Sequence, residues 1–441
     1  MSHAQSRGVV AEVAVIGAGV HGASAAFHLA RRGLDVVVFE RGRPAGGPTG
    51  RSSGICRAYY TQPFLARVAH DSIAFLAEFA EHTDGGDAGF VRTGGLYLHG
   101  PADVADARRT AATLVGLDIT VETLDADEVA RRFPGIDVGD GAGIGPGPGP
   151  GPGPDGDGDG AGFGPGAAGR DGQVAIAVRE EQAGYADPYR TTWGFVTAAR
   201  AHGALVHSNA RVVRITETPG QVELTTADGT THRARRLLLA AGPWTAPLAA
   251  QLGVTLPLHA ERHVVAVLGP ASPAAGADAD ADPGVIIDVA GGYYTAPQPD
   301  GGWMLGGLDS TPPVDPDTAP APVRDAEFAQ LAEAALRRRP GRSTEAQPQP
   351  RVQSRTRVGG WSAFYDVSPD WQPVIGQITD RVWVDAGTSG HGFKLAPVLG
   401  DHVAGLLAGE QPAPGLAAFS PSRFTAGDSL TAGFGTARIL G

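Results

Sequence analysis

The sequence predicts an α/β fold (α+β overall), in which a mixed-sheet domain is inserted into a domain built on a parallel sheet. Two observations lead to this prediction. The first forty residues read as strand, glycine-rich turn, helix and second strand, and the second half holds short strand-like segments broken by turns. The chain has 441 residues, which is long for a single compact core, so we expect two domains.

The N-terminal segment has the pattern of a Rossmann-type dinucleotide-binding unit. An apolar run ending at Ile16 precedes Gly17-x-Gly19-x-x-Gly22, a helical pattern follows, and a valine-rich run ends in Glu40. The glycines permit a sharp turn and let the backbone approach a pyrophosphate, and the helix N-terminus offers N–H groups to the phosphates. Glu40 is placed to accept hydrogen bonds from ribose hydroxyls and disfavours a 2′-phosphate, so NADP is not expected.

The remaining elements follow from periodicity and turn residues. Residues 192–201 are expected to form a helix and 204–207 a strand, and 211–215 and 222–226 alternate as an antiparallel pair around a Pro-Gly turn. Four strand-like pieces suit a mixed sheet, at 264–268, 284–288, 293–296 and 302–307. Residues 326–338 are amphipathic and end in arginines, which favour the helix dipole.

Composition argues against several classes of protein. The net charge of −12 argues against a nucleic-acid partner, which needs a basic face. The single cysteine, Cys56, rules out a disulfide within the chain and a cysteine-built metal site, and no metal is expected. No apolar run is long enough to span a membrane and the N-terminus lacks a signal-peptide pattern, so we expect a cytoplasmic protein. A Gly/Pro/Asp-rich stretch at about 139–170 predicts a disordered insert.

Several blocks together resemble one known family. They are 47–60, which holds Thr49-Gly50-Arg51-Ser52-Ser53-Gly54, then 184–188, 236–244, 365–376 and 385–397, with Ser389-Gly390-His391-Gly392-Phe393-Lys394 the most specific. They resemble the FAD-dependent amino acid oxidase (DAO) superfamily, and most of all its sarcosine oxidase and dimethylglycine dehydrogenase branch. The resemblance extends from about Val9 to about Phe424, with gaps at the low-complexity loops.

The resemblance implies FAD as the cofactor. The residues expected to bind it are Gly17, Gly19, Val20, His21, Gly22, Glu40, Arg41, Thr49, Gly50, Arg51, Ser52, Ser53, Gly54, Arg211, Val212, Ala240, Ala241, Gly242, Trp244, Gly387, Ser389, Gly390, His391, Gly392, Phe393 and Lys394. The loop at 49–54 is small, hydroxyl-bearing and glycine-rich, so its backbone N–H groups can face a pyrophosphate or flavin edge.

The resemblance also implies an oxidation of a C–N bond in an amine or amino acid. A hydride equivalent would pass to flavin N5 and leave an imine, with O₂ or another acceptor reoxidising the flavin. By similarity to sarcosine oxidase, Arg57 and Lys394 match the residues that hold the substrate carboxylate, Tyr365 matches an active-site tyrosine, and His391 lies at the flavin. Tyr60 is expected in the same pocket.

The sequence departs from the family pattern at two positions. Ala363 stands where monomeric sarcosine oxidases carry the cysteine that is bonded to flavin, and no histidine lies near residues 49–54. We therefore expect non-covalent FAD. Met304 stands where the oxidases carry a lysine that speeds reaction with O₂, so a quinone or a flavoprotein is an alternative acceptor.

The family layout predicts a discontinuous FAD-binding domain and an inserted substrate-binding domain. The first would comprise residues 9–86, 184–257 and 353–424, and the second residues 87–182 and 258–351. Residues 425–441 are expected to form a C-terminal tail.

Three functions stay open at this point. The leading one is an FAD-dependent oxidoreductase of a secondary or tertiary, sarcosine-like amino acid. The same fold could instead serve a D-amino acid, glycine or a cyclic imino acid. A third reading, from a different class, is a flavin-binding electron-transfer subunit without chemistry of its own. Arg57, Tyr365 and Lys394 argue against it, because such a subunit has no need for a carboxylate clamp.

Overall fold

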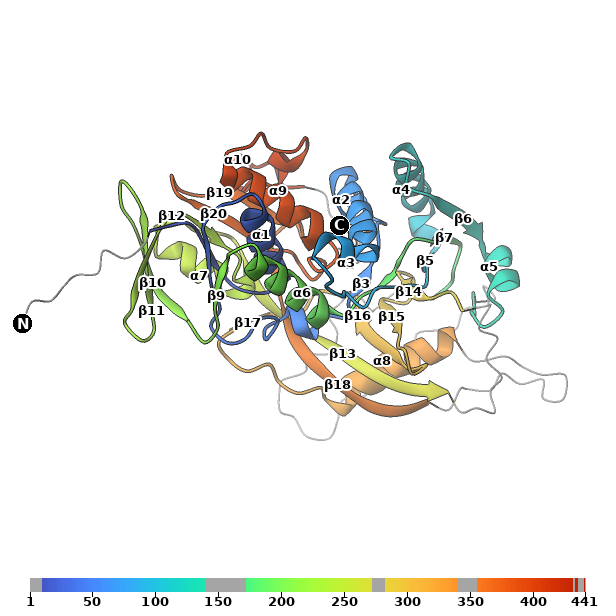
Figure 1. Cartoon of the computed structure of the whole chain (residues 1–441). Helices are drawn as coiled ribbons and strands as arrows, with labels where there is room; N and C mark the ends of the chain where they lie inside the picture. Colours follow the sequence, from blue (N-terminus) through green and yellow to red (C-terminus); the bar gives the residue numbers. More distant parts are fainter. Residues whose placement is uncertain are drawn as a thin grey trace, which may run out of the picture.

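A computed structural model describes residues 10–139, 172–271, 282–339, 355–430, 433–434 and 440. The predicted insert at about 139–170 lies almost entirely outside these residues. Figure 1 shows two sheets side by side, with helices between and around them. Within the described part, no helix is both long and apolar enough to cross a bilayer.

The first sheet contains the N-terminal unit. Its order is β10 (Val212–Glu217), β11 (Val222–Thr226), β12 (Thr231–Leu239), β1 (Ala11–Ile16), β2 (Val36–Phe39) and β9 (Leu205–His207), with β20 (Val382–Ala386) on β12 and β19 (Val374–Gln377) on β20. The strands β20, β12, β1, β2 and β9 run parallel to one another. Their carboxyl ends therefore meet at one edge, where parallel sheets bind ligands.

Three helices pack together over this sheet. They are α1 (Val20–Arg31), α6 (Pro188–Ala201) and α9 (Ala396–Ala408), and α2 (Pro63–Ala77) packs against α9. Because α1 lies between α6 and α9, it is buried along nearly its whole length, from Val20 to Ala30. The first turn of α1 is thereby held against the segment that leads into α9. The chain also forms three short helices, α3 (Phe79–His82), α7 (Thr245–Ala250) and α10 (Arg423–Ala426).

The second sheet is mixed. Its order is β17 (Pro313–Val314), β13 (His259–Ala271), β16 (Trp303–Gly307), β15 (Tyr293–Pro297), β14 (Val285–Asp288), β5 (Gly95–His99), β7 (Ile176–Glu180) and β6 (Val121–Asp125), with β18 (Arg355–Val367) also on β13. Helix α8 (Asp325–Arg338) covers one face, and α4 (Val104–Gly116) and α5 (Ala126–Arg132) pack near β6 and β7.

Alternation along β13 gives the second sheet two different faces. Val264, Ala266 and Leu268 belong to the apolar cluster beneath α8, whereas His263 and Val265 face the opposite way and line a cleft between the sheets. Successive strand residues point to opposite faces, so one strand supplies both the core under α8 and the roof of the cleft. A small third sheet of β3 (Ile55–Cys56), β8 (Gly184–Tyr185) and β4 (Val91–Arg92) lies apart from these two.

The expected strands and helices are confirmed, including the antiparallel pair β10–β11 and the helix α8. The division into domains stays a prediction, but β18 pairs with β13 in the second sheet rather than joining the first. The expected C-terminal tail is not wholly peripheral. Phe434 is buried and its ring stacks near Tyr59 and His99.

Candidate active site

The turn between β1 and α1 requires glycine on steric grounds. Gly17 has φ +106°, and a Cβ there would lie 2.3 Å from the carbonyl oxygen of Ala240. A Cβ on Gly22 would lie 2.0 Å from the carbonyl oxygen of Gly17, so α1 begins in direct contact with the turn. The backbone N–H of Val20 donates to the hydroxyl of Thr49 at 3.2 Å. The N-terminus of α1 therefore faces the same space as Gly17, Gly19 and Thr49.

Glu40 closes the other side of the turn. Its carboxylate accepts from the backbone N–H of Ala18 at 2.9 Å and from that of Gly42 at 2.8 Å. Each oxygen uses one lone pair in these bonds and keeps another for a ribose hydroxyl. Beyond Glu40, the guanidinium of Arg41 lies 3.6 Å from the centre of the Trp244 ring, and Trp244 donates to Asp317. This stacked pair joins the end of β2 to the turn after β12.

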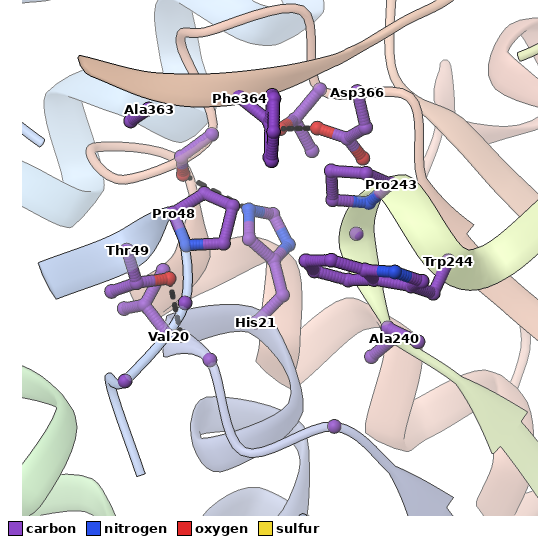
Figure 2. A pocket seen from close by; sticks show the side chains of 18 of the residues that line it. Val20, His21, Pro48, Thr49, Ala240, Pro243, Trp244, Ala363, Phe364 and Asp366 are labelled. Atoms are coloured by element: carbon purple, nitrogen blue, oxygen red, sulfur yellow. Dashed lines mark hydrogen bonds between the residues drawn. The ribbon is translucent and has the colours of Figure 1, made fainter. Parts of the chain in front are cut away.

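A cleft of about 790 Å³ runs along this edge of the first sheet and under the second. Figure 2 shows His21 pointing from α1 into it, with Trp244 and Pro48 to either side and Phe364 and Asp366 above. Most of the expected cofactor-binding residues line it: Gly17, Gly19, Val20, His21, Glu40, Arg41, Thr49, Arg51, Ser52, Ser53, Arg211, Val212, Ala240, Ala241, Gly242, Trp244, Gly390, Gly392 and Phe393. The glycine cradle and the paired acid fit a dinucleotide that contains a pyrophosphate and a ribose.

Several expected residues lie behind this lining. Gly50 and Gly54 pack on backbone, because a Cβ would lie 2.2 Å from the oxygen of Ala45 and 2.0 Å from that of Ala186, respectively. Gly22, Gly387 and Ser389 are also absent from the lining. These five residues were predicted to bind the cofactor, and that prediction remains untested.

Tyr365 lies at the end of the cleft under the second sheet. Its ring stacks on that of His263 with 3.8 Å between centroids, and its hydroxyl bonds with that of Tyr294. Burial raises the pKa of Tyr365 well above its usual value, so the phenol stays protonated. Gly390 has φ +81°, and a Cβ there would lie 2.2 Å from the Tyr365 ring. The glycine before His391 thus sets how closely the loop approaches this tyrosine.

His391 is a neutral imidazole with a defined tautomer. Its Nε2 lies 2.9 Å from the carbonyl oxygen of Trp371, which can only accept, so Nε2 carries the hydrogen. Nδ1 then accepts from the hydroxyl of Tyr60 at 3.3 Å. Burial, and next the charge of Lys394, lower the pKa of His391 to about 3. His391 therefore positions neighbouring groups and carries no charge near neutral pH.

Arg57 and Lys394 lie together behind the cleft and do not line it. Arg57 donates to the carbonyl of Tyr59 and stacks over the Tyr60 ring at 4.4 Å. The ammonium of Lys394 donates to the carbonyl of His391 at 3.3 Å. Burial, and next the charge of Arg57, lower the pKa of Lys394 well below its usual value. An anion bound beside Arg57 and Lys394 would offset this shift and favour the charged ammonium.

Glu180 is the acid that balances part of this charge. It is 1% exposed, accepts from the N–H of Ala58 at 2.8 Å and from the hydroxyl of Tyr97 at 2.6 Å, and acts on both Arg57 and Lys394. No motif in the sequence points to Glu180. Only the pairing of β7 with β5 brings it beneath the loop that carries Arg57.

Comparison with known proteins identifies this arrangement. The family model described as FAD dependent oxidoreductase (DAO) matches residues 12–149 and 162–406. The chain belongs to this family. It is 25% identical over 422 residues to the human peroxisomal sarcosine oxidase, covering 93% of this chain and 95% of that one. It is 27% identical over 428 residues to the monomeric sarcosine oxidase of Streptomyces avermitilis, covering 94% and 98%. The L-proline dehydrogenase from P. horikoshii has a similar fold, with a TM-score of 0.76, 21% identity and coverage of 96% and 99%.

Membership of the DAO family makes the chain an FAD-dependent amine or amino acid oxidoreductase. The cleft fits FAD, and the binding of the dinucleotide by the turn at Gly17, the acid Glu40 and the loop at 49–54 stays a prediction. Among the described residues, no cluster of three or more His, Cys, Asp or Glu side chains could hold a metal ion.

Several polar residues that line the cleft were not predicted from the sequence, among them His263, Tyr294, Asp366 and Asp385. His263 and Tyr294 come from the second sheet, and Asp366 and Asp385 from the ends of β18 and β20. Asp366 and Asp385 lie in the blocks 365–376 and 385–397, and an acidic residue at the end of an apolar strand could have indicated a place in the site. His263 lies on the same face of its strand as Glu261 and Val265, but the sequence does not say which face meets the cleft.

Proposed function

We propose that the protein oxidises the C–N bond of a small N-methylated, sarcosine-like amino acid. The observation that carries the proposal is the buried pair of basic groups, Arg57 and Lys394, next to Tyr60 and His391 behind the cleft. A substrate carboxylate there would favour the charged form of Lys394, and a planar guanidinium positions a carboxylate well. The relatives named for sarcosine and for N-methyl-L-tryptophan support an N-methyl substrate.

Each residue of the site has a distinct part in the proposed reaction. When bound, FAD supplies the acceptor for the hydride equivalent that leaves the carbon next to nitrogen. Arg57 and Lys394 hold the carboxylate, so that the reacting carbon lies at the cleft end lined by Tyr365. The neutral His391 fixes the Tyr60 hydroxyl and, through its carbonyl, the ammonium of Lys394. Tyr365, Tyr294 and His263 form a rigid aromatic wall that excludes water from the nitrogen.

The electron acceptor is a separate part of the proposal. Met304 stands where the oxidases carry their oxygen-activating lysine, and it packs against the apolar core. A thioether has no charge with which to stabilise reduced oxygen, so we propose slow reoxidation by O₂ and faster transfer to a quinone or a flavoprotein. The measurement compares the rate of reoxidation in air with that of an artificial acceptor. Rapid reoxidation in air would contradict this part and leave the substrate class intact.

Ala363 bears on how the cofactor is held. It lines the cleft opposite His263 on β13 and has no nucleophile, so a thioether at this position is excluded. We predict that FAD is bound without a covalent link. Acid precipitation of the holoenzyme should give a colourless pellet and a yellow supernatant, and a yellow pellet would show the prediction to be wrong.

An anaerobic screen that follows the bleaching of the flavin absorbance tests the substrate class. The panel holds N-methyl amino acids, D-amino acids with glycine, and cyclic imino acids. The proposal expects bleaching by the first group at the lowest concentrations. Faster bleaching by D-amino acids or by cyclic imino acids would replace it with the corresponding alternative, and no bleaching by any of them would favour a non-catalytic flavoprotein.

Substitution of the clamp tests the role of the cations. Arg57→Ala should raise KM roughly 30- to 150-fold, since a charge-assisted hydrogen bond is worth about 2–3 kcal/mol. Arg92→Ala, at an exposed position of β4, is the matched control and should leave KM unchanged. An unchanged KM in Arg57→Ala would remove Arg57 from the substrate site.

A further inference from the structure

The imidazole of His21 faces two hydrogen-bond acceptors. Its Nδ1 lies 2.9 Å from Oδ2 of Asp385, and its Nε2 lies 3.0 Å from the carbonyl oxygen of Gly392. A neutral imidazole has one N–H and can satisfy one of them, whereas an imidazolium has two and satisfies both. The side chain of His21 is 11% exposed and that of Asp385 is fully buried, so both bonds are largely shielded from water.

The charges around His21 also favour the imidazolium. Asp385 comes from β20 and Asp366 from β18, and both act on His21. Asp366 accepts from the N–H of Gly387 at 2.7 Å and from the hydroxyl of Thr388 at 3.1 Å. The Oδ1 atom of Asp385 is buried without a hydrogen-bond partner among the described residues. Two buried carboxylates thus lie in the wall of a cleft that must hold the pyrophosphate of FAD, which is itself anionic, and a nearby positive charge offsets that repulsion.

The other titratable groups on the neighbouring elements do not supply this charge. His391, in the loop before α9, is neutral because its pKa is lowered to about 3. Lys394, in the same loop, bonds to the carbonyl of His391. Glu40, at the end of β2, is an acid held by two backbone N–H groups. Among these groups, His21 is the one placed to compensate Asp385.

His21 also joins two segments that the proposed reaction needs together. It lies in the first turn of α1, which faces the phosphates, and Gly392 lies in the loop that carries His391 and Lys394. In Figure 2 the ring rises from α1 into the cleft between Pro48 and Trp244. A Cβ on Gly392 would lie 2.8 Å from Nε2 of His21, so the contact is tight.

We propose that His21 is a positioning residue, held as an imidazolium, that clamps the phosphate-binding turn to the His391–Lys394 loop and compensates Asp385 beside the cofactor. Loss of its proton leaves the Asp385 carboxylate uncompensated and breaks one of the two bonds, so FAD binding weakens at alkaline pH.

The pH window follows from the direction of the shift. Burial lowers the pKa of His21, but the charge and hydrogen bond of Asp385, with Asp366 and the Gly392 carbonyl, raise it above its usual 6.5. A raised pKa means that the stabilisation is complete below the unfolded value. It is lost as the pH rises through the folded value, above 6.5.

The protonation state is tested by nitrogen NMR on the FAD-loaded full chain with labelled histidines. His28 is a useful comparison, because its two nitrogens also lie near acceptors, Asp401 at 3.1 Å and the carbonyl of Pro397 at 3.0 Å, but it lies outside the FAD cleft. In a pH titration, His28→Gln should contain one imidazolium that loses its proton only above pH 6.5, and that signal should be missing from His21→Gln. If every ring of His28→Gln loses its proton at or below pH 6.5, the proposal is overturned, even if His21→Gln does not fold.

The coupling to the cofactor is tested by the dissociation constant of FAD between pH 6 and 9. The wild type should bind FAD more weakly as pH rises, and His21→Gln should bind about tenfold more weakly at pH 6.5, with no such pH dependence. Asp385→Asn added to His21→Gln removes the uncompensated carboxylate and should recover most of the affinity, and His28→Gln should match the wild type. Equal affinity in His21→Gln and the wild type, or no recovery in the double variant, would refute the clamp. Because these measurements need no substrate, they are independent of the proposed reaction.

Discussion

Replacing Arg423 by methionine should destabilise the protein more than any single substitution on its surface. The Arg423 guanidinium uses all five of its N–H groups: two bond to Asp370 at 2.8 and 2.9 Å, and three bond to the carbonyls of Phe419, Ser420 and Gln372 at 2.7, 3.3 and 3.0 Å. Arg423 is 4% exposed and Asp370 6%. Removal of one partner from a buried pair leaves the other charge unpaired and costs about 3–5 kcal/mol.

The same substitution should reach the active site through the segment 368–372. Asp370 also accepts from Ser368 and from the N–H groups of Gln372 and Leu430. Trp371, which lies between Asp370 and Gln372, has φ +59°, and its carbonyl oxygen accepts a hydrogen bond from His391. Loosening of this segment therefore weakens the bond that sets the tautomer of His391.

Urea unfolding of the apoprotein and of the FAD-loaded protein measures the effect. Arg337→Met is the matched control, because Arg337 and its partner Glu333 are exposed at 59% and 67%, and an exposed pair contributes at most about 1 kcal/mol. Adding Asp370→Leu to Arg423→Met should recover part of the loss, since the unpaired charge is removed. A loss in Arg423→Met no larger than that in Arg337→Met would refute the reasoning.

Three further predictions concern Gly390, His391 and Glu261. Gly390→Ala places a methyl group against the Tyr365 ring at a backbone with φ +81°. The value of kcat/KM in steady-state assays should therefore fall at least about tenfold. An unchanged kcat/KM would mean that the Tyr365 ring shifts freely. Because the pKa of His391 is about 3, the pH–rate profile of His391→Gln between pH 5 and 9 should keep the wild-type shape at a lower level, and loss of an ionisation would contradict the neutral tautomer. Burial raises the pKa of Glu261, but hydrogen bonds from His263, Thr311, Ser310 and His259 lower it from 4.5 to about 2. The stabilisation that the Glu261 carboxylate contributes is therefore present above pH 4.5 and is lost as the pH falls towards 2. In urea unfolding, Glu261→Gln should lose less stability than the wild type between pH 4.5 and pH 2.

The turn at Gly17 and the acid Glu40 could be predicted from the sequence because their reasons are local. Gly17 must have positive φ, and the helix that follows must begin within a few residues, so spacing alone encodes the geometry. The antiparallel pair β10–β11 has the same character, since a short turn joins its strands. In each case the residues that interact are neighbours along the chain.

The rest of the site depends on contacts between distant segments. The place of β18 follows from its register with β13, where Tyr365 lies opposite Glu261 and Ala363 opposite His263. The alternation within β18 is compatible with a strand in either sheet. The face of β13 that meets the cleft also depends on contacts between distant segments. If β13 were shifted by one residue in the sheet, His263 would face α8. For the same reason Glu180 could not be predicted beneath Arg57.

The charge of His21 depends on contacts that the glycine pattern of the family does not describe. The pattern accounts for the glycines around His21, because any dinucleotide needs them, but it leaves the residue between them open. A histidine there is neutral or charged according to its partners, and those partners lie 364 and 371 residues away along the chain. A buried acid beside an anionic cofactor is unfavourable unless it is compensated. In the proposed clamp, a proton on His21 therefore compensates Asp385 and strengthens the binding of FAD.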